Sequence, residues 1–281
     1  MTPYATGKDW TLYAGECSEV MKEHIPDESI DLILTSPPYD NLRSYKDYDF
    51  DFFKIARELI RVTIPGGIIV WVVGDQTKDG SESGTSFKQA LYFKAKGLRL
   101  HDTMIYQTDK QPLNDNRYEP KFEYMFVFSK GRPSIWNPIT EPSTYGGSKC
   151  SPTEYNQDGT KKEWHGNGII KTEKVLGNVW YIPSGRGKSN KEDVKHPAVF
   201  PDELARRHIL TWSNKNDLVF DPMCGSGTVQ KMALMTGRKT IGIDISTEYL
   251  DIAKQRIELT RLPLFEQPDV EVTAEQLGLT I

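Results

Sequence analysis

Apolar runs alternate along the chain with segments of helical periodicity. Residues 30–34 are mostly apolar and residues 68–73 are a continuous apolar run, both of the length of buried strands. Between them apolar residues recur at helical spacing over 52–60, and Pro65-Gly66-Gly67 ends that predicted helix. A second helix is predicted over 86–95, and further strands near 103–107 and 122–128. Strands that alternate with helices predict an α/β fold, in which a mostly parallel sheet carries helices on both faces.

The periodicity is lost between residues 131 and 195, where Gly, Pro, Ser, Asn and Lys dominate. It returns with a helix over 201–212, a strand over 218–221, a glycine turn, a helix from Thr228, a strand over 239–244 and a helix from Thr247. We therefore expect a catalytic and cofactor-binding core from residues 1–130 and 196–262. Residues 131–195 form an inserted region, and residues 263–281 form a C-terminal tail.

Composition narrows the class of protein. The chain of 281 residues has a formal net charge of −4, so any contact with nucleic acid must be local rather than a general coating. The three cysteines are far apart and the histidines lack ligand spacing, which predicts neither disulfides nor a metal site. No apolar run is long enough to span a membrane, and the first ten residues lack the order of a signal peptide, so we expect a cytoplasmic protein.

Basic residues gather inside the inserted region. They make either a surface that lies along DNA phosphates or an ordinary solvated loop, and acidic neighbours such as Glu163 and Asp193 dilute them. The basic residues are Lys149, Lys161, Lys162, Lys171, Lys174, Arg186, Lys188 and Lys191.

A glycine turn with two acidic residues predicts a site for an adenosine cofactor. Residues 221–228 read Asp-Pro-Met-Cys-Gly-Ser-Gly-Thr, and Asp244 ends the next strand. Glycines allow the backbone to approach a ligand closely, and a carboxylate at a strand end can accept hydrogen bonds from ribose hydroxyls. Position 230 is Gln where a dinucleotide loop has Gly, and Asp221 would repel a pyrophosphate. The positively charged S-adenosylmethionine fits better.

The sequence Thr35-Ser36-Pro37-Pro38-Tyr39 follows the first predicted strand. Prolines stiffen this loop, so that carbonyl oxygens and the Ser36 hydroxyl can accept the hydrogens of an amine, while Tyr39 can stack on a base. An exocyclic amine is paired inside a duplex, so its base must be flipped out, which costs a few kcal/mol. An ordinary Pro-Pro turn is the alternative for this string taken alone.

Together these segments resemble the β-class amino methyltransferases of DNA, over residues 15–258. That resemblance implies a Rossmann-like S-adenosylmethionine-dependent methyltransferase fold with a circularly permuted motif order, in which the catalytic loop precedes the cofactor loop and a target-recognition lobe is inserted between them. Ser36, Pro37, Pro38 and Tyr39 are then the catalytic residues. The residues that would bind the cofactor are Asp221, Pro222, Cys224, Gly225, Gly227, Thr228 and Asp244, with His196 and Phe200 in the segment that closes over it.

Two details refine the resemblance. Ser36 is similar to the residue found in cytosine-N4 enzymes, whereas adenine-N6 enzymes more often have Asp or Asn there. We expect N4 methylation of a flipped cytosine in double-stranded DNA, with adenine N6 as the alternative. The family often has Gly-Asp-Cys near the N-terminus, where this chain has Gly15-Glu16-Cys17. A separate cognate restriction endonuclease and a monomer or homodimer are also expected from the resemblance.

Overall fold

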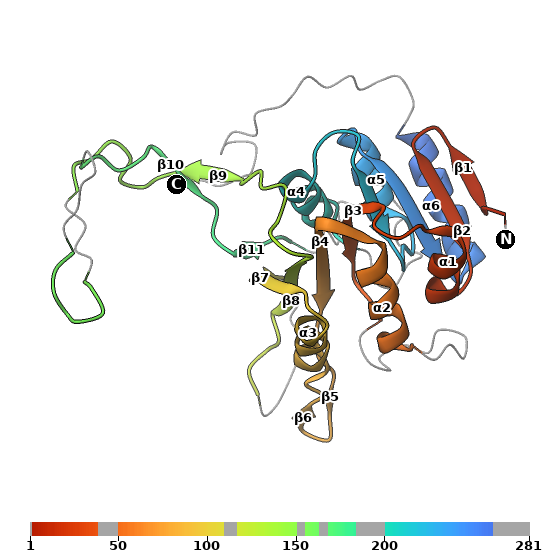
Figure 1. The fold of residues 1–281 in the computed structure, drawn as a ribbon, viewed down its shortest axis with the longest axis horizontal. Coiled ribbons are helices and arrows are strands. Elements are labelled where there is room, and N and C mark those ends of the chain that lie inside the picture. Colours follow the sequence, from red (N-terminus) through yellow and green to blue (C-terminus); the bar gives the residue numbers. More distant parts are fainter. Residues whose placement is uncertain are drawn as a thin grey trace. The chain divides into compact units, whose positions relative to one another are not determined.

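A computed structural model describes residues 2–38, 50–109, 117–150, 155–162, 168–183 and 200–260. Its centre is a nine-stranded sheet in which every strand except β1 and β8 runs in the same direction (Figure 1). The strands, in spatial order, are β1 (Ala5–Gly7), β2 (Trp10–Ala14), β13 (Lys239–Asp244), β12 (Leu218–Asp221), β3 (Ile30–Thr35), β4 (Thr63–Val73), β8 (Phe122–Ser129), β7 (Arg99–Gln107) and β11 (Val179–Tyr181).

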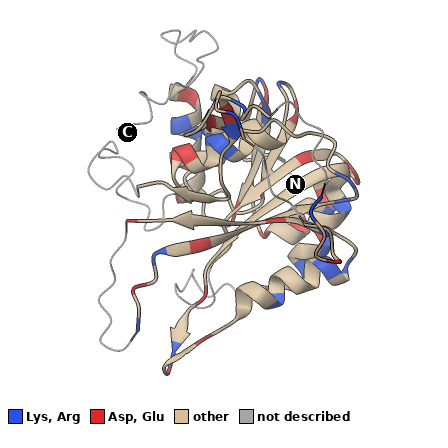
Figure 2. Ribbon diagram, turned by 90° about the vertical axis from the view of Figure 1, so that its left-hand side faces the viewer, with Lys and Arg blue, Asp and Glu red and all other residues tan. Residues whose placement is uncertain are grey.

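Helices cover both faces of this sheet, which confirms the α/β prediction. Apolar residues of the strands are buried under them, and Figure 2 shows that charged residues lie mainly on helices and loops. One face carries α1 (Cys17–His24), α2 (Phe52–Val62) and α3 (Thr85–Ala95), and the other carries α4 (Asp202–Trp212), α5 (Thr228–Met235) and α6 (Thr247–Leu259).

The topological switch point of the sheet lies between β12 and β3, because successive strands are added in opposite directions on its two sides. The chain proceeds from β12 to β13 on one side, and from β3 to β4 on the other. Ligands of open α/β sheets bind at such a switch point, beyond the carboxyl ends of the strands. The strand that precedes the Pro-Pro loop comes earlier in the chain than the glycine-loop strand, so the predicted permuted order is confirmed.

The sequence patterns missed the first elements and misread one turn. β1, β2 and α1 were not predicted, because β1 and β2 are only three and five residues long and mix polar with apolar positions. Pro65-Gly66-Gly67 does follow the end of α2, but it lies within β4 rather than in a connecting loop. The pairing with β3 jumps there from Thr63 to Ile68, and this irregularity accommodates the proline.

Residues 138–177 form a compact unit separate from the sheet. Their described part contains the antiparallel pair β9 (Thr140–Pro142) and β10 (Glu173–Val175), and most of its residues are exposed. The predicted insert of 131–195 is longer than this unit, since β11 pairs with β7 in the main sheet. Another short pair, β5 (Thr77–Lys78) and β6 (Ser81–Glu82), follows β4.

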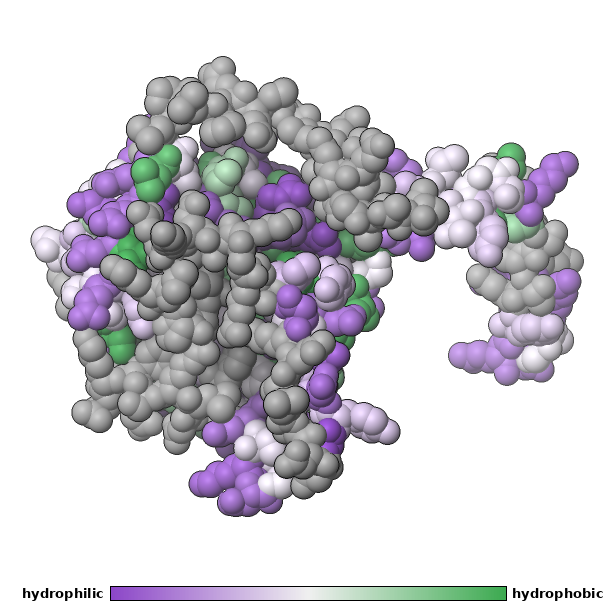
Figure 3. Space-filling model, turned by 180° about the vertical axis from the view of Figure 1, so that it is seen from behind, coloured by the Kyte–Doolittle hydropathy of each residue, from purple (hydrophilic) through white to green (hydrophobic). Residues whose placement is uncertain are grey.

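The surface of the described residues is largely hydrophilic, with scattered apolar side chains (Figure 3). Among those residues, we find no helix with both the length and the apolar character that a membrane span requires.

Candidate active site

The first half of the site is the segment that leaves β3. Thr35 is fully buried at the end of the strand, Pro37 is buried, and Ser36 and Pro38 are partly exposed. Two successive prolines have fixed φ angles and no N–H groups, so the chain leaves the sheet here in a stiff conformation. Tyr39, the remaining predicted catalytic residue, lies outside the described residues.

The second half is the glycine loop between β12 and α5. Gly225 and Gly227 have φ angles of +49° and +77°, a region that residues with a Cβ rarely adopt. A Cβ on Gly227 would also lie 2.7 Å from the Cβ of Ala253 on α6. The absence of a side chain therefore lets the start of α5 pack directly on α6, and this contact fixes where the loop ends.

Asp244, at the end of β13, holds the glycine loop through backbone groups. Its Oδ2 accepts a hydrogen bond from the Gly225 N–H at 2.8 Å, and its Oδ1 accepts one from the Ser246 N–H at 2.8 Å. The Cys224 N–H donates to the Ile243 carbonyl at 2.8 Å. These bonds tie the loop to the neighbouring strand, yet each carboxylate oxygen retains capacity for a further donor.

A buried hydrogen bond joins the two halves. The Thr35 hydroxyl, at the tip of β3, lies 2.7 Å from Oδ1 of Asp221 at the tip of β12 and donates to it. The same oxygen accepts the Met223 N–H at 3.1 Å. The segments that precede the Pro-Pro loop and the glycine loop, 186 positions apart in the chain, are thus in direct contact.

The electrostatics of this edge favour a cation. Burial, and secondarily the charge of Asp244, raise the pKa of Asp221 to about 7, and burial also raises the pKa of Asp244. Neither carboxylate pairs with a Lys or Arg among the described residues. Two such carboxylates beside a glycine loop suit a ligand that carries positive charge.

The other residues predicted to bind the cofactor have different surroundings. Pro222 is buried, and the Cys224 side chain packs in the core beside Leu12 and Leu250, where burial raises the pKa of its thiol. Thr228 is buried and its hydroxyl accepts from Arg256 at 3.2 Å. Phe200 is half-buried just before α4, and His196 lies outside the described residues.

Three side chains of this edge had no predicted role. Arg256 of α6 donates to the Ser226 carbonyl at 2.9 Å and thereby supports the glycine loop. Asp75 follows β4 and accepts the Ser86 N–H at 2.9 Å, near the start of α3. Glu16 caps α1 by accepting the N–H groups of Ser18 and Glu19, each at 3.0 Å. Asp75, which follows the predicted strand over 68–73, could have been suspected from sequence position, and Glu16 was noted only as the departure from the family's Gly-Asp-Cys.

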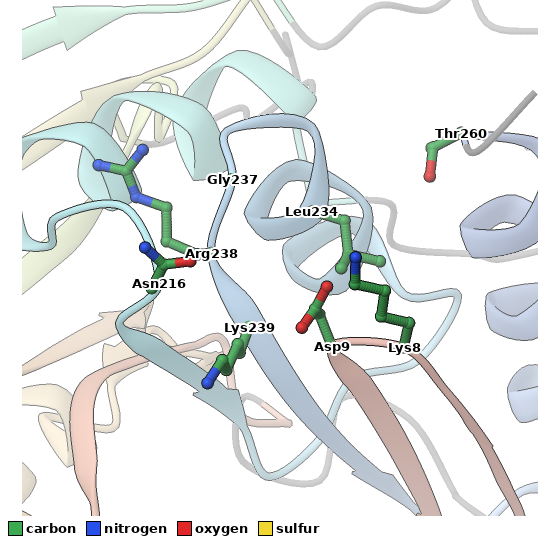
Figure 4. Close-up of a pocket in the computed structure, with 8 residues that line it drawn as sticks. All are labelled: Lys8, Asp9, Asn216, Leu234, Gly237, Arg238, Lys239 and Thr260. Carbon is green, nitrogen blue, oxygen red and sulfur yellow. The ribbon is translucent and has the colours of Figure 1, made fainter. Parts of the chain in front are cut away.

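A hollow of about 430 Å³ lies elsewhere, at the amino ends of the strands. Lys8 and Asp9 lie side by side there, while the Arg238 guanidinium points away from both (Figure 4). Arg238 instead donates to the carbonyl and hydroxyl of Ser213. Among the described residues, no group of three or more His, Cys, Asp or Glu is arranged to hold a metal.

The fold and this edge define an α/β protein with a cation-favouring nucleotide site and a proline-stiffened loop on adjacent strands. Residues 30–255 match the family described as DNA methylase, so the chain belongs to that family and is a DNA methyltransferase.

Curated relatives and solved structures agree with this family. The orphan methyltransferase M.BamHII of Bacillus amyloliquefaciens is 51% identical over 85% of this chain and 92% of its own length. The DNA adenine methyltransferase YhdJ of Escherichia coli K12 is 27% identical over 89% of this chain and 83% of its own. The cytosine-N4-specific PvuII DNA methyltransferase superposes with a TM-score of 0.68 at 19% identity, over 98% of this chain and 92% of that one, and the two proteins therefore share a fold.

Proposed function

We propose that this chain transfers a methyl group from S-adenosylmethionine to the N4 amine of a cytosine that is flipped out of double-stranded DNA. The observation that carries the proposal is the Thr35–Asp221 hydrogen bond at 2.7 Å, because it joins the ends of β3 and β12. The loop after β3 would hold the target base, and the loop after β12 would hold the methyl-donating cofactor. Membership of the DNA methylase family supplies the substrate class.

The residues at the glycine loop fit S-adenosylmethionine. When bound, this cofactor supplies an electrophilic methyl group on a positively charged sulfonium. Asp221 and Asp244 are two carboxylates without a Lys or Arg partner in the described part of the chain, and the pKa of each is raised chiefly by burial. A cationic ligand would relieve that cost by favouring their ionised forms. In this proposal Gly225 and Gly227 allow close approach, Pro222, Cys224 and Thr228 shape the loop, and His196 and Phe200 close over the ligand.

The loop after β3 acts on the amine. The lone pair of an exocyclic amine is delocalised into the ring, so the nitrogen is a weak nucleophile. Ser36 and the Pro37 carbonyl accept the amine hydrogens and turn the lone pair toward the methyl group, while Pro38 stiffens the loop and Tyr39 stacks on the ring. Transfer would be direct: the nitrogen would take the methyl group from the bound sulfonium, a neutral thioether would be left, and the amine would release its proton to solvent.

Cytosine is favoured over adenine by Ser36, which resembles the residue of cytosine-N4 enzymes. We assign target recognition to the inserted region and its basic residues, and a separate cognate endonuclease and the oligomeric state stay predictions.

The test is to incubate the purified chain with S-adenosylmethionine and unmethylated plasmid DNA, and to analyse the nucleosides by mass spectrometry. We expect N4-methylcytosine, and a Ser36→Ala variant should lose about 10²- to 10³-fold in turnover while binding the cofactor within about threefold. N6-methyladenine alone would overturn the choice of base. No methylated nucleoside from a folded, cofactor-binding protein would overturn the proposal as a whole.

A further inference from the structure

The hydrogen bond between Thr35 and Asp221 has an unusual setting. Thr35 is fully buried and Asp221 is 5% exposed, and the bond links neighbouring strands rather than residues of one loop. A threonine hydroxyl has a single hydrogen to donate, and here it is directed at the carboxylate. A buried carboxylate at the end of β12, whose other residues are apolar, costs desolvation that a hydrogen bond only partly offsets, so stability alone does not account for the pair.

The groups that face Asp221 explain what the hydroxyl does there. Asp244 approaches from β13 and disfavours a second negative charge, and the neutral Cys224 thiol lies on the same loop. The donors that favour the charged carboxylate are the Thr35 hydroxyl from β3 and the Met223 N–H of the loop itself. Thr35 is therefore the one side chain among the described residues that donates a hydrogen bond to Asp221.

We propose that Thr35 is a positioning residue for the cofactor: its hydroxyl orients the Asp221 carboxylate toward the cationic methyl donor. Strand β3, which leads into the Pro-Pro loop that would hold the target base, would then also help to form the cofactor site. This inference rests on the proposed function. It assigns Thr35 no contact with the reacting atoms, because its side chain is fully buried and directed at Asp221.

The consequence is a pH-dependent affinity that a residue of the other strand controls. Only the ionised form of Asp221 attracts a cation, so affinity should rise with pH through the pKa of about 7. Removal of the hydroxyl takes away a bond that favours the ionised form, which moves this rise to higher pH. Near pH 7 a variant without the hydroxyl should bind a cationic ligand more weakly, and the difference should shrink in alkaline solution.

The experiment measures the affinity of the full chain for sinefungin, a cationic analogue of S-adenosylmethionine, by calorimetry between pH 6 and 9. The variants are Thr35→Val, which removes the hydroxyl and keeps the shape, and Thr35→Ser, which keeps the hydroxyl. We expect Val to weaken binding about tenfold at pH 7 and to move the midpoint of the profile upward, and Ser to follow the wild type. Thr35→Ala serves as the second variant if the Val protein does not fold.

A double variant separates positioning from simple packing. In an Asp221→Asn background, Thr35→Val should cause no further loss of affinity, because the negative charge that the hydroxyl orients is already gone even though the amide oxygen can still accept the hydrogen bond. Identical pH profiles for folded wild type and Thr35→Val would overturn the inference, and so would a loss that persists in the Asn background. If the wild type binds sinefungin with the expected profile but methylates no DNA, only the proposed function fails.

Discussion

Two charged groups at opposite edges of the sheet, the partly buried Arg61 and the buried Asp221, have opposite surroundings. At the amino edge, Arg61 donates to the carbonyls of Met21 and Ile25 and pairs with Asp27 and Glu58. At the carboxyl edge, Asp221 and Asp244 lie beside each other with raised pKa values and without a cationic partner in the described part of the chain. Removal of one partner from a paired charge destabilises a fold, whereas a buried carboxylate without a cationic partner costs stability and is a candidate ligand site.

The largest effect is expected for Asp221→Asn. The variant should lose about 10³-fold or more in methylation, because it lacks the carboxylate that the proposed function places beside the cationic cofactor. Without ligand it should be at least as stable as the wild type at pH 8. The pKa of Asp221 is raised from 3.8 to about 7, so wild-type stability contributed by the neutral form is lost as pH rises from about 4 to 7, and Asn has no such loss.

Denaturant unfolding at pH 5 and pH 8, together with methylation assays, checks this prediction. The exposed Asp79, in the turn between β5 and β6, gives a matched control, and Asp79→Asn should change neither quantity. An Asp221→Asn protein that methylates normally, or that is clearly destabilised at pH 8, would contradict the contrast between the edges.

Arg61→Ala should have the opposite signature. Its side chain is 26% exposed, and its removal leaves two backbone carbonyls and two carboxylates without their shared donor. We expect the free energy of unfolding to fall by about 1–3 kcal/mol, while kcat/KM of the folded protein stays within about threefold. Arg61→Lys, which keeps the charge but not the fork of donors, should lie between the two. A large loss of kcat/KM in a stable Arg61→Ala protein would show that the amino edge serves catalysis.

His208 should affect stability in the opposite direction from Asp221, because its pKa is lowered whereas that of Asp221 is raised. Its ring is fully buried, contacts Met125 and lies 4.8 Å from the ring of Trp180, and burial lowers its pKa from 6.5 to about 3. Below pH 6.5 the unfolded chain therefore takes up a proton that the folded chain does not, and stability falls. Relative to His208→Phe, the wild type should lose about 1.4 kcal/mol per pH unit below about pH 6. Parallel stability curves for the two proteins between pH 4.5 and 7 would refute this.

The sequence predicted the elements that are long or strongly periodic, and it placed both loops after the correct strands. It could not predict that β3 and β12 are neighbours, because strand order follows from packing across 186 positions and not from local pattern. Without that adjacency, Thr35 was only the residue before a motif and Asp221 only a carboxylate near glycines. The short β1 and β2 and the bulge at Pro65 were missed because tertiary pairing overrides weak or contrary local signals there.

The smallest effect is expected at the hollow of the amino edge. Lys8 and Lys239 line it, and Lys239 immediately starts β13 at the end opposite to Asp244. Arg238 is the buried cationic residue among those that line the hollow, and it donates its hydrogen bonds to Ser213. It therefore differs from Asp221, which has no oppositely charged partner among the described residues. A Lys8→Ser, Lys239→Ser double variant should keep its unfolding free energy within about 0.5 kcal/mol and its sinefungin affinity and methylation rate within about twofold. A tenfold loss of sinefungin affinity or of methylation rate would show that the amino edge also contributes to function. The presence or absence of a partner for each charged group would then not distinguish the two edges of the sheet.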